Sequence, residues 1–194
     1  LSDPVVFGPE DSGTASAPIT YAAAKGARPV FFGGQRLPPF EAGPDGVWNT
    51  RVDPALRFEQ LYVNGRRAVR ARSPNRFYHY MREPVQYGVD PLTGKAIDLS
   101  RRAFIADKAD IAPLADIRPE ALSNVVVRAF HSWEVNQARV QSVAQDSGQV
   151  TVTPSTRWPY FHWTPHLPRY QLENFREALD APGEWFLDEA GILS

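Results

Sequence analysis

The chain has 194 residues, of which 43% are hydrophobic and 22% are charged, as is usual for a globular protein with its own core. The 21 basic and 22 acidic residues leave a formal net charge of −1, so charge gives no reason to expect nucleic acid or an anionic membrane as a partner. Cysteine is absent, which excludes disulfides, thiol catalysis and zinc–thiolate sites. No apolar run approaches the roughly 18 residues of a membrane span.

Residues 1–36 contain three short apolar runs bounded by turn-forming residues: Val5–Phe7, Ile19–Ala22 and Val30–Phe32. Strands of this length at this spacing are typical of a small sandwich or of the coils of a β-solenoid. The chain begins at Leu1 rather than Met, with the first strand-like run close behind it. We therefore expect the chain to be an internal piece of a larger protein.

The central part of the chain predicts further strands. An isolated strand is expected over residues 47–52, inside a loop-rich stretch. Asn64-Gly65 then predicts a tight β-hairpin between a strand over 58–63 and a return strand over 66–72. Pro119 favours the first turn of a short helix that ends at Leu122.

The last part of the chain predicts three more strands and one helix. The strands are expected at Val125–Trp133, Ala138–Val143 and Gln149–Thr153, with Ser147-Gly148 as the turn between the last two. Leu172, Phe175 and Leu179 lie at helical spacing, which predicts a short helix over 171–181, ended by Pro182-Gly183. A final strand is expected around residues 185–188. The fold class is therefore all-β, with one short helix near the C-terminus.

Arginine is dense between residues 57 and 76, where Glu59 is the only acidic residue. Guanidinium groups bind carboxylates and phosphates through bidentate hydrogen bonds, so the cluster is compatible with an anion-binding site. The alternative is that Arg70 and Arg72, two residues apart, line one face of a strand and form local pairs. The six arginines are Arg57, Arg66, Arg67, Arg70, Arg72 and Arg76.

Residues 154–168 form a proline-rich aromatic loop. Trp158, Tyr160 and Trp163 are the candidate substrate-binding residues, because flat aromatic rings stack on the C–H faces of sugars. Alternatively, these rings cap a hydrophobic core. His162 and His166 have the spacing of a helical metal pair, but prolines at 159, 165 and 168 disfavour a helix there, and no metal site or cofactor is expected.

No catalytic residues stand out in the sequence. Glycoside hydrolysis needs two suitably spaced carboxylates, and no spacing singles out a pair. The chain also contains no Gly-x-Ser-x-Gly elbow and no glycine-rich phosphate loop. The available carboxylates are Asp107, Asp110, Asp116, Glu134 and Asp146.

Three groups of segments resemble secreted right-handed parallel β-helix proteins, a group that includes xylosidase- and fucosidase-like glycoside hydrolases. Gly8–Thr14, Ala17–Tyr21 and Gly33-Gly34 look like an early coil. Leu61–Ala68 with Arg70–Asn75 is similar to the hairpin that opens an inserted β-domain in this group. Arg169-Tyr170, Glu173-Asn174 and Ala181–Asp188 look like the stretch where the chain returns to the helix.

The resemblance implies a division into incomplete β-helix coils over 1–44, an inserted antiparallel, sandwich-like β-domain over 45–168, and a return to the β-helix over 169–194. It implies a secreted or periplasmic parent that acts on a polysaccharide or oligosaccharide, with the catalytic carboxylates outside this chain. A polysaccharide lyase or a non-catalytic carbohydrate-binding module on the same scaffold are the alternatives. The sequence predicts no oligomeric state.

Overall fold

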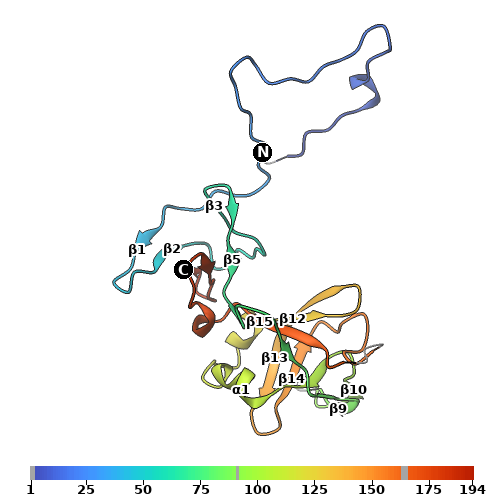
Figure 1. The fold of residues 1–194 in the computed structure, drawn as a ribbon, viewed down its shortest axis with the longest axis vertical. Coiled ribbons are helices and arrows are strands. Elements are labelled where there is room, and N and C mark those ends of the chain that lie inside the picture. The colour runs from blue at the N-terminus through green and yellow to red at the C-terminus, as the bar shows by residue number, and fades with distance from the viewer. Residues whose placement is uncertain (1–2, 91, 163–165) are drawn as a thin grey trace. The chain divides into compact units, whose positions relative to one another are not determined.

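The structure is a computed structural model that describes residues 3–90, 92–162 and 166–194. It divides into two units, Leu1–Pro38 and Pro39–Ser194 (Figure 1). No helix in the described ranges has both the length and the apolar character needed to cross a membrane.

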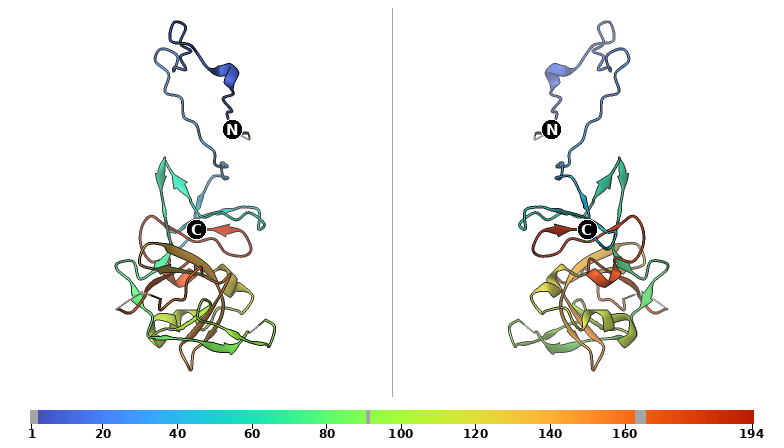
Figure 2. Two further views of the ribbon diagram at one scale, coloured as in Figure 1. Left: turned by 90° about the vertical axis from the view of Figure 1, so that its right-hand side faces the viewer. Right: turned by 90° about the vertical axis from the view of Figure 1, so that its left-hand side faces the viewer.

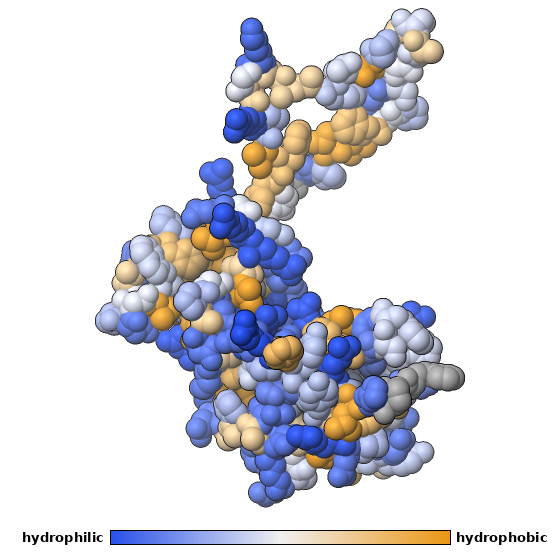
Figure 3. Space-filling model, in the orientation of Figure 1, coloured by the Kyte–Doolittle hydropathy of each residue, from blue (hydrophilic) through white to orange (hydrophobic). Residues whose placement is uncertain are grey.

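The described residues of the first unit contain no strand. Their only regular element is the 3₁₀ helix η1 (Pro9–Asp11), and Thr14 and Ala17 form an isolated bridge. The three strands predicted in this region are therefore wrong. A short apolar run becomes a strand only when a neighbour takes up its hydrogen bonds and covers one face. Here the apolar side chains are exposed, up to 84% for Val30, and the unit shows a continuous hydrophobic run in Figure 3.

The second unit is mainly β-structure, which confirms the all-β prediction. Its only α-helix among the described residues is α1 (Lys108–Ile111), and its 3₁₀ helices are η2 (Ala112–Leu114), η3 (Ala121–Asn124) and η4 (Arg176–Ala178). The strands are β1 (Glu41–Ala42), β2 (Trp48–Arg51), β3 (Tyr62–Val63), β4 (Arg66–Arg67), β5 (Val69–Arg70), β6 (Arg72–Ser73), β7 (His79–Tyr80), β8 (Glu83–Pro84), β9 (Tyr87–Val89), β10 (Ala96–Asp98), β11 (Ala103–Ile105), β12 (Val126–Phe130), β13 (Val135–Ala144), β14 (Gln149–Thr153), β15 (Arg169–Glu173), β16 (Glu184–Trp185) and β17 (Ile192–Leu193).

Eight of these strands form one antiparallel sheet. Its order is β6-β15-β12-β13-β14-β11-β8, and β7 also pairs with β15, beyond the end of β6. Strands β12 to β15 lie side by side in Figure 1. The predicted strands over 125–133, 138–143 and 149–153 are confirmed as β12, β13 and β14.

The core lies on one face of this sheet, because alternate side chains of a strand point to the same side. Tyr170 and Leu172 of β15 are fully buried, as are Val140 of β13 and Val152 of β14. Phe104 of β11 packs against Tyr170, with ring centroids 5.0 Å apart. Helical segments around residues 108–124 add further buried side chains: Ile111, Leu114 and Leu122.

Both turns predicted from glycine-containing pairs are confirmed. Asn64 and Gly65 have φ of 51° and 75° and connect β3 to β4, a hairpin that stands out from the rest of its unit in Figure 2. Gly148 connects β13 to β14 with φ of 79°. A Cβ atom there would come within 2.6 Å of the Ala106 carbonyl oxygen, so the position also requires glycine for space.

The helix predicted over 171–181 is wrong. Arg169–Glu173 is a strand between β12 on one side and β6 and β7 on the other, and only the 3₁₀ turn η4 follows it. Tyr170, Gln171, Leu172 and Glu173 are all buried, so this strand has protein on both of its faces. Helical spacing of apolar residues cannot reveal such a strand, and tertiary packing overrides the local pattern.

The remaining pairs are mostly antiparallel. β16 pairs in parallel with β5, and β1, β2 and β17 form a small antiparallel sheet that contains the predicted strand over 47–52. The parallel β-helix coils expected in 1–44 and 169–194 are not found among the described residues. β15, at the start of the last expected segment, belongs to the large sheet.

Candidate functional site

A hollow in the second unit measures about 500 Å³, within the size range of ligand sites. It lies where the ends of β7, β12 and β15 meet the loops that follow β12 and β14. No Asp or Glu is among the described residues that line it: Tyr80, Phe130, His131, Ser132, Tyr160, His162, His166, Leu167, Pro168 and Arg169.

Tyr80 and Arg169 form one wall of this cavity. They are directly opposite each other in the β7–β15 pairing, so both side chains lie on the same face of the sheet. The Tyr80 residue is 42% exposed, and Arg169 is exposed as well. The Arg169 guanidinium lies 4.8 Å from the centroid of the Tyr78 ring, a cation–π contact that fixes its position. The wall thus presents an aromatic ring beside a fork of hydrogen-bond donors.

Imidazole rings form much of the remaining lining. His131 begins the turn after β12, and its amide donates to the Glu134 carbonyl oxygen at 2.9 Å. Burial lowers the pKa of His131 below its ordinary value, although the Glu134 carboxylate opposes the shift. The ring is therefore neutral at pH 7, and a neutral imidazole both donates and accepts hydrogen bonds.

The three residues predicted to bind a sugar have different environments. Trp158 is partly buried and does not line the cavity, but its ring stacks on His162, which does, at 5.4 Å and 7°. Tyr160 is only 1% exposed and packs edge-on against Phe104 at 5.1 Å, so it presents no ring face to a ligand. Trp163 lies outside the described residues.

The Tyr160 hydroxyl is a buried oxygen with no hydrogen-bond partner in the described part of the chain. Burial raises the pKa of this phenol well above its ordinary value, so the group remains neutral. His131 stacks on the Tyr160 ring with centroids 6.0 Å apart, and its Nε2 is also buried without a partner among the described residues. Both residues line the cavity, and Tyr160 also belongs to the hydrophobic core.

Sequence reasoning missed most of the lining, in particular Tyr80, Phe130, His131 and Arg169. Tyr80 and Arg169 are 89 positions apart in the printed sequence, and only the pairing of β7 with β15 brings them together. No strand was expected at residues 169–173, so that pairing was not expected either. The part of the lining that the sequence did indicate is the aromatic loop, which supplies Tyr160 and His162.

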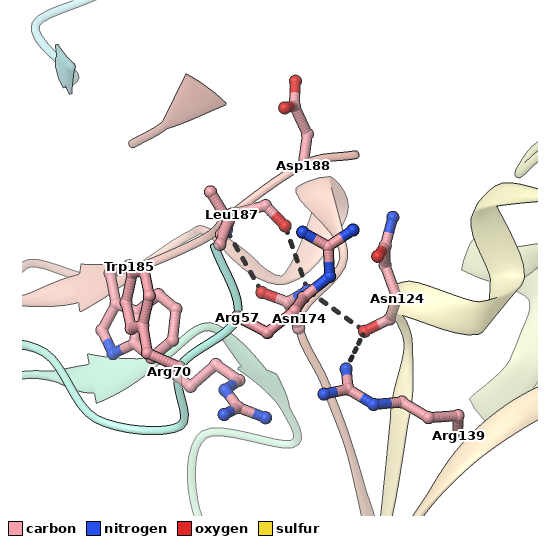
Figure 4. A pocket seen from close by; sticks show the side chains of 9 residues that line it. Arg57, Arg70, Asn124, Arg139, Asn174, Trp185, Leu187 and Asp188 are labelled. Carbon is pink, nitrogen blue, oxygen red and sulfur yellow. Dashed lines mark hydrogen bonds between the residues drawn. The ribbon is translucent and has the colours of Figure 1, made fainter. Parts of the chain in front are cut away.

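The second hollow is much smaller, about 20 Å³, which is room for about one water molecule. Figure 4 shows Asn174 at its centre. The Asn174 amide nitrogen donates to the Asn124 and Leu187 carbonyl oxygens, both at 3.1 Å, and its oxygen accepts from the Leu187 amide at 3.2 Å. Arg139 donates to the same Asn124 oxygen at 3.2 Å. This hollow is a structural junction that is too small for a sugar.

Two members of the arginine cluster, Arg70 and Arg72, form local contacts. Arg70 is buried, forms an ion pair with Glu59, lies 3.7 Å from Glu173 and stacks over Trp185 at 5.1 Å. Arg72 donates to the Asn75 carbonyl oxygen. For Arg70 and Arg72 the described contacts therefore favour local pairing over an anion-binding site. No group of three or more potential metal ligands occurs in the described ranges.

Comparison with known proteins gives a fold relative. No protein-family model and no curated protein matches the chain. One solved structure, described as a glycoside hydrolase, matches with a TM-score of 0.59 and 23% sequence identity over 83% of this chain. The match spans 28% of that protein, so the chain corresponds to less than a third of its length. At this identity the likeness concerns the fold alone: the chain has a glycoside hydrolase-like fold.

Proposed function

We propose that the chain is a saccharide-binding part of a carbohydrate-active protein, and that the larger cavity holds the saccharide. The observation that carries the proposal is the lining of this cavity, whose described residues supply aromatic rings, imidazoles and one arginine but no carboxylate. Sugars are bound by aromatic faces that stack on C–H groups and by planar donors that pair with hydroxyls. The lining supplies both kinds of group.

The same lining argues against hydrolysis within this cavity. Glycosidases use an Asp or Glu pair, either about 5 Å apart or about 6.5 to 9.5 Å apart. With no described carboxylate in the lining, the cavity is suited to holding a saccharide and not to cleaving it. We propose that the parent protein is a glycoside hydrolase built on a parallel β-helix, with its catalytic carboxylates outside residues 1–194. The fold likeness to a glycoside hydrolase supports the proposal that the parent protein is a glycoside hydrolase.

A secreted or periplasmic location belongs to the same proposal, because a polymeric substrate must be met outside the cytoplasm. A polysaccharide lyase is less well supported. Lyases must neutralise a uronate carboxylate, and the arginine cluster was the only argument for that chemistry. Arg70 is already paired with Glu59 and lies near Glu173, so its charge is compensated.

Affinity electrophoresis in gels that contain soluble polysaccharides tests the proposal. The wild-type chain should be retarded, and Tyr80→Ala should lose most of this retardation because the exposed ring on the cavity wall is removed. Stacking contacts of this kind contribute on the order of 1 kcal/mol, or roughly fivefold in affinity. Aryl-glycosides should not be hydrolysed by either protein.

Tyr87→Ala is the matched control. Tyr87 is 82% exposed on β9 and does not line the cavity, so its removal should leave the retardation unchanged. Equal retardation of the wild-type and Tyr80→Ala proteins would contradict binding at this wall. Turnover of an aryl-glycoside that depends on a carboxylate of this chain would contradict the non-catalytic assignment.

A further inference from the structure

A second cluster of polar side chains lies at the edge of the large sheet, away from the cavity lining. Ser73 of β6 is opposite Leu172 of β15, and His79 of β7 is opposite Tyr170. Leu172 and Tyr170 are two residues apart, so their side chains share a face of the sheet. Ser73 and His79 therefore project to this same face, although a five-residue loop separates them in the sequence.

The contacts within this cluster form a chain of hydrogen bonds. Ser73 Oγ is 3.1 Å from His79 Nε2, and His79 Nδ1 is 3.0 Å from Asp110 Oδ1. The second carboxylate oxygen, Asp110 Oδ2, accepts a hydrogen bond from the Tyr170 hydroxyl at 3.1 Å. Asp110 is part of the short helix α1. Three elements thus meet at one imidazole.

This arrangement fixes the tautomer of His79. A carboxylate accepts hydrogen bonds only, so Nδ1 carries the proton and Nε2 is left to accept the Ser73 hydroxyl proton. A base that contacts a hydroxyl, and is itself oriented by a third group, is the arrangement that activates serine nucleophiles. We propose that Ser73, His79 and Asp110 make Ser73 a nucleophile toward small carboxylic esters. The proposal does not depend on the saccharide cavity.

The reaction uses only groups of this site and water. Ser73 Oγ attacks the ester carbonyl carbon while His79 Nε2 takes the hydroxyl proton. The tetrahedral intermediate collapses, the bond to the alcohol oxygen breaks, and His79 returns the proton to the departing alcohol. Water then attacks the acyl-serine carbonyl carbon and loses a proton to His79 Nε2. The bond between the acyl carbon and Ser73 Oγ breaks, His79 returns the proton to Ser73 Oγ, and the carboxylic acid leaves. Asp110 and Tyr170 are positioning residues that orient the imidazole.

The surroundings provide access and hydrogen-bond donors. Ser73 is partly exposed, and Phe77, in the loop between Ser73 and His79, is 82% exposed and offers an apolar surface beside the site. The amides of Asn75 and Arg76 in the same loop form no hydrogen bond with the described residues. They are the candidate donors to the oxyanion that forms during acyl transfer.

Labelling of the full chain with a fluorophosphonate, followed by peptide mass spectrometry, tests the proposal. The adduct should be found on Ser73, and p-nitrophenyl acetate should be hydrolysed. His79→Gln should slow labelling by at least about 100-fold, the usual contribution of a general base. Ser147→Ala, which changes a hydroxyl in the β13–β14 turn, should leave labelling unchanged.

The pH dependence of the labelling rate shows whether Asp110 acts on the imidazole of His79 or only stabilises the fold. The groups that face His79 are Ser73, Tyr170, Asp110 and Asp107. Burial lowers the pKa of His79, and the two carboxylates oppose that shift. Asp110→Asn should therefore reduce the labelling rate and move its acid limb to lower pH.

The site of the adduct in the wild-type chain decides the proposal even if Ser73→Ala fails to fold. No adduct, or an adduct confined to other residues, would overturn it. Labelling that persists at the wild-type rate in His79→Gln would overturn the role of the imidazole. Labelling and ester hydrolysis that both disappear in folded Ser73→Ala, with an unchanged melting temperature, would support it.

Discussion

Tyr160 and Tyr170 occupy the same core but differ in the partner of their hydroxyl groups. Tyr170 donates to the Asp110 carboxylate, whereas the Tyr160 hydroxyl is buried without a partner in the described part of the chain. A hydrogen bond to a charged group contributes about 1.5–3 kcal/mol, and a buried hydroxyl with no partner costs free energy. The two phenols therefore respond differently to the same chemical change.

The Tyr-to-Phe change at each position should give opposite results. Tyr170→Phe should lower the free energy of unfolding by about 1.5–3 kcal/mol, whereas Tyr160→Phe should leave it unchanged or raise it. Urea unfolding curves of the two variants measure this difference. A loss of stability in Tyr160→Phe as large as that in Tyr170→Phe would show that its hydroxyl has a partner.

His79 and His131 predict acid sensitivity between pH 7 and pH 5. Burial lowers the pKa of each below its ordinary value of 6.5, so the unfolded chain binds more protons than the folded chain near and below that pH. The free energy of unfolding should therefore fall as the pH drops. The pKa values of Asp90, Asp98 and Asp107 are lowered as well, but their stabilisation is lost only at lower pH, near and below 3.8.

Urea unfolding at pH 7.5 and pH 5.0 checks this prediction. The loss of stability should be smaller in the double variant His79→Gln/His131→Gln than in the wild-type chain. Ser147→Ala, which removes no ionisable group, provides the control and should retain the wild-type loss. An identical loss in the double variant would mean that other groups cause the acid sensitivity.

At the scale of elements, Asn174 joins the end of β15 to two other segments. Its side chain makes three hydrogen bonds, one to Asn124 at the end of η3 and two to the backbone of Leu187, and its φ is 63°. Asparagine tolerates this left-handed backbone better than most residues. The side chain thus stabilises both a turn and the attachment of residues 184–194.

Asn174→Ala should cost about 2–4 kcal/mol, because it removes three hydrogen bonds, leaves buried carbonyl and amide groups without partners, and strains the turn. Thermal unfolding monitored by circular dichroism measures the loss. Asn136→Ala, which removes one side-chain bond to Glu134, should cost less than 1 kcal/mol. Equal effects of the two changes would contradict the role given to Asn174.

The sequence predicted correctly those elements that depend on residues close together in the chain. Asn64-Gly65 and Ser147-Gly148 specify their turns through positive φ, and β12 to β14 carry apolar, β-branched residues. β15 was missed because its identity depends on neighbours distant in the sequence. The runs in residues 5–32 failed for the converse reason: they have strand-like composition but no described partner.

At the scale of the whole molecule, the candidate site is assembled from segments that no local pattern connects. The aromatic loop indicated one part of it, through Tyr160 and His162. Tyr80, His131 and Arg169 come from three strand ends whose proximity follows only from the topology of the eight-stranded sheet. The sequence alone therefore predicts the β-rich class and part of the site but not the cavity.

The chain contains only four histidines, and three of them line the cavity, so an imidazole-detected NMR titration with an oligosaccharide tests the central claim most directly. His131, His162 and His166 should shift in a saturable way, whereas His79, which lies outside the lining, should not. Shifts at His79 alone, or no saturable shift of any imidazole with saccharides that retard the chain in gels, would contradict saccharide binding in this cavity.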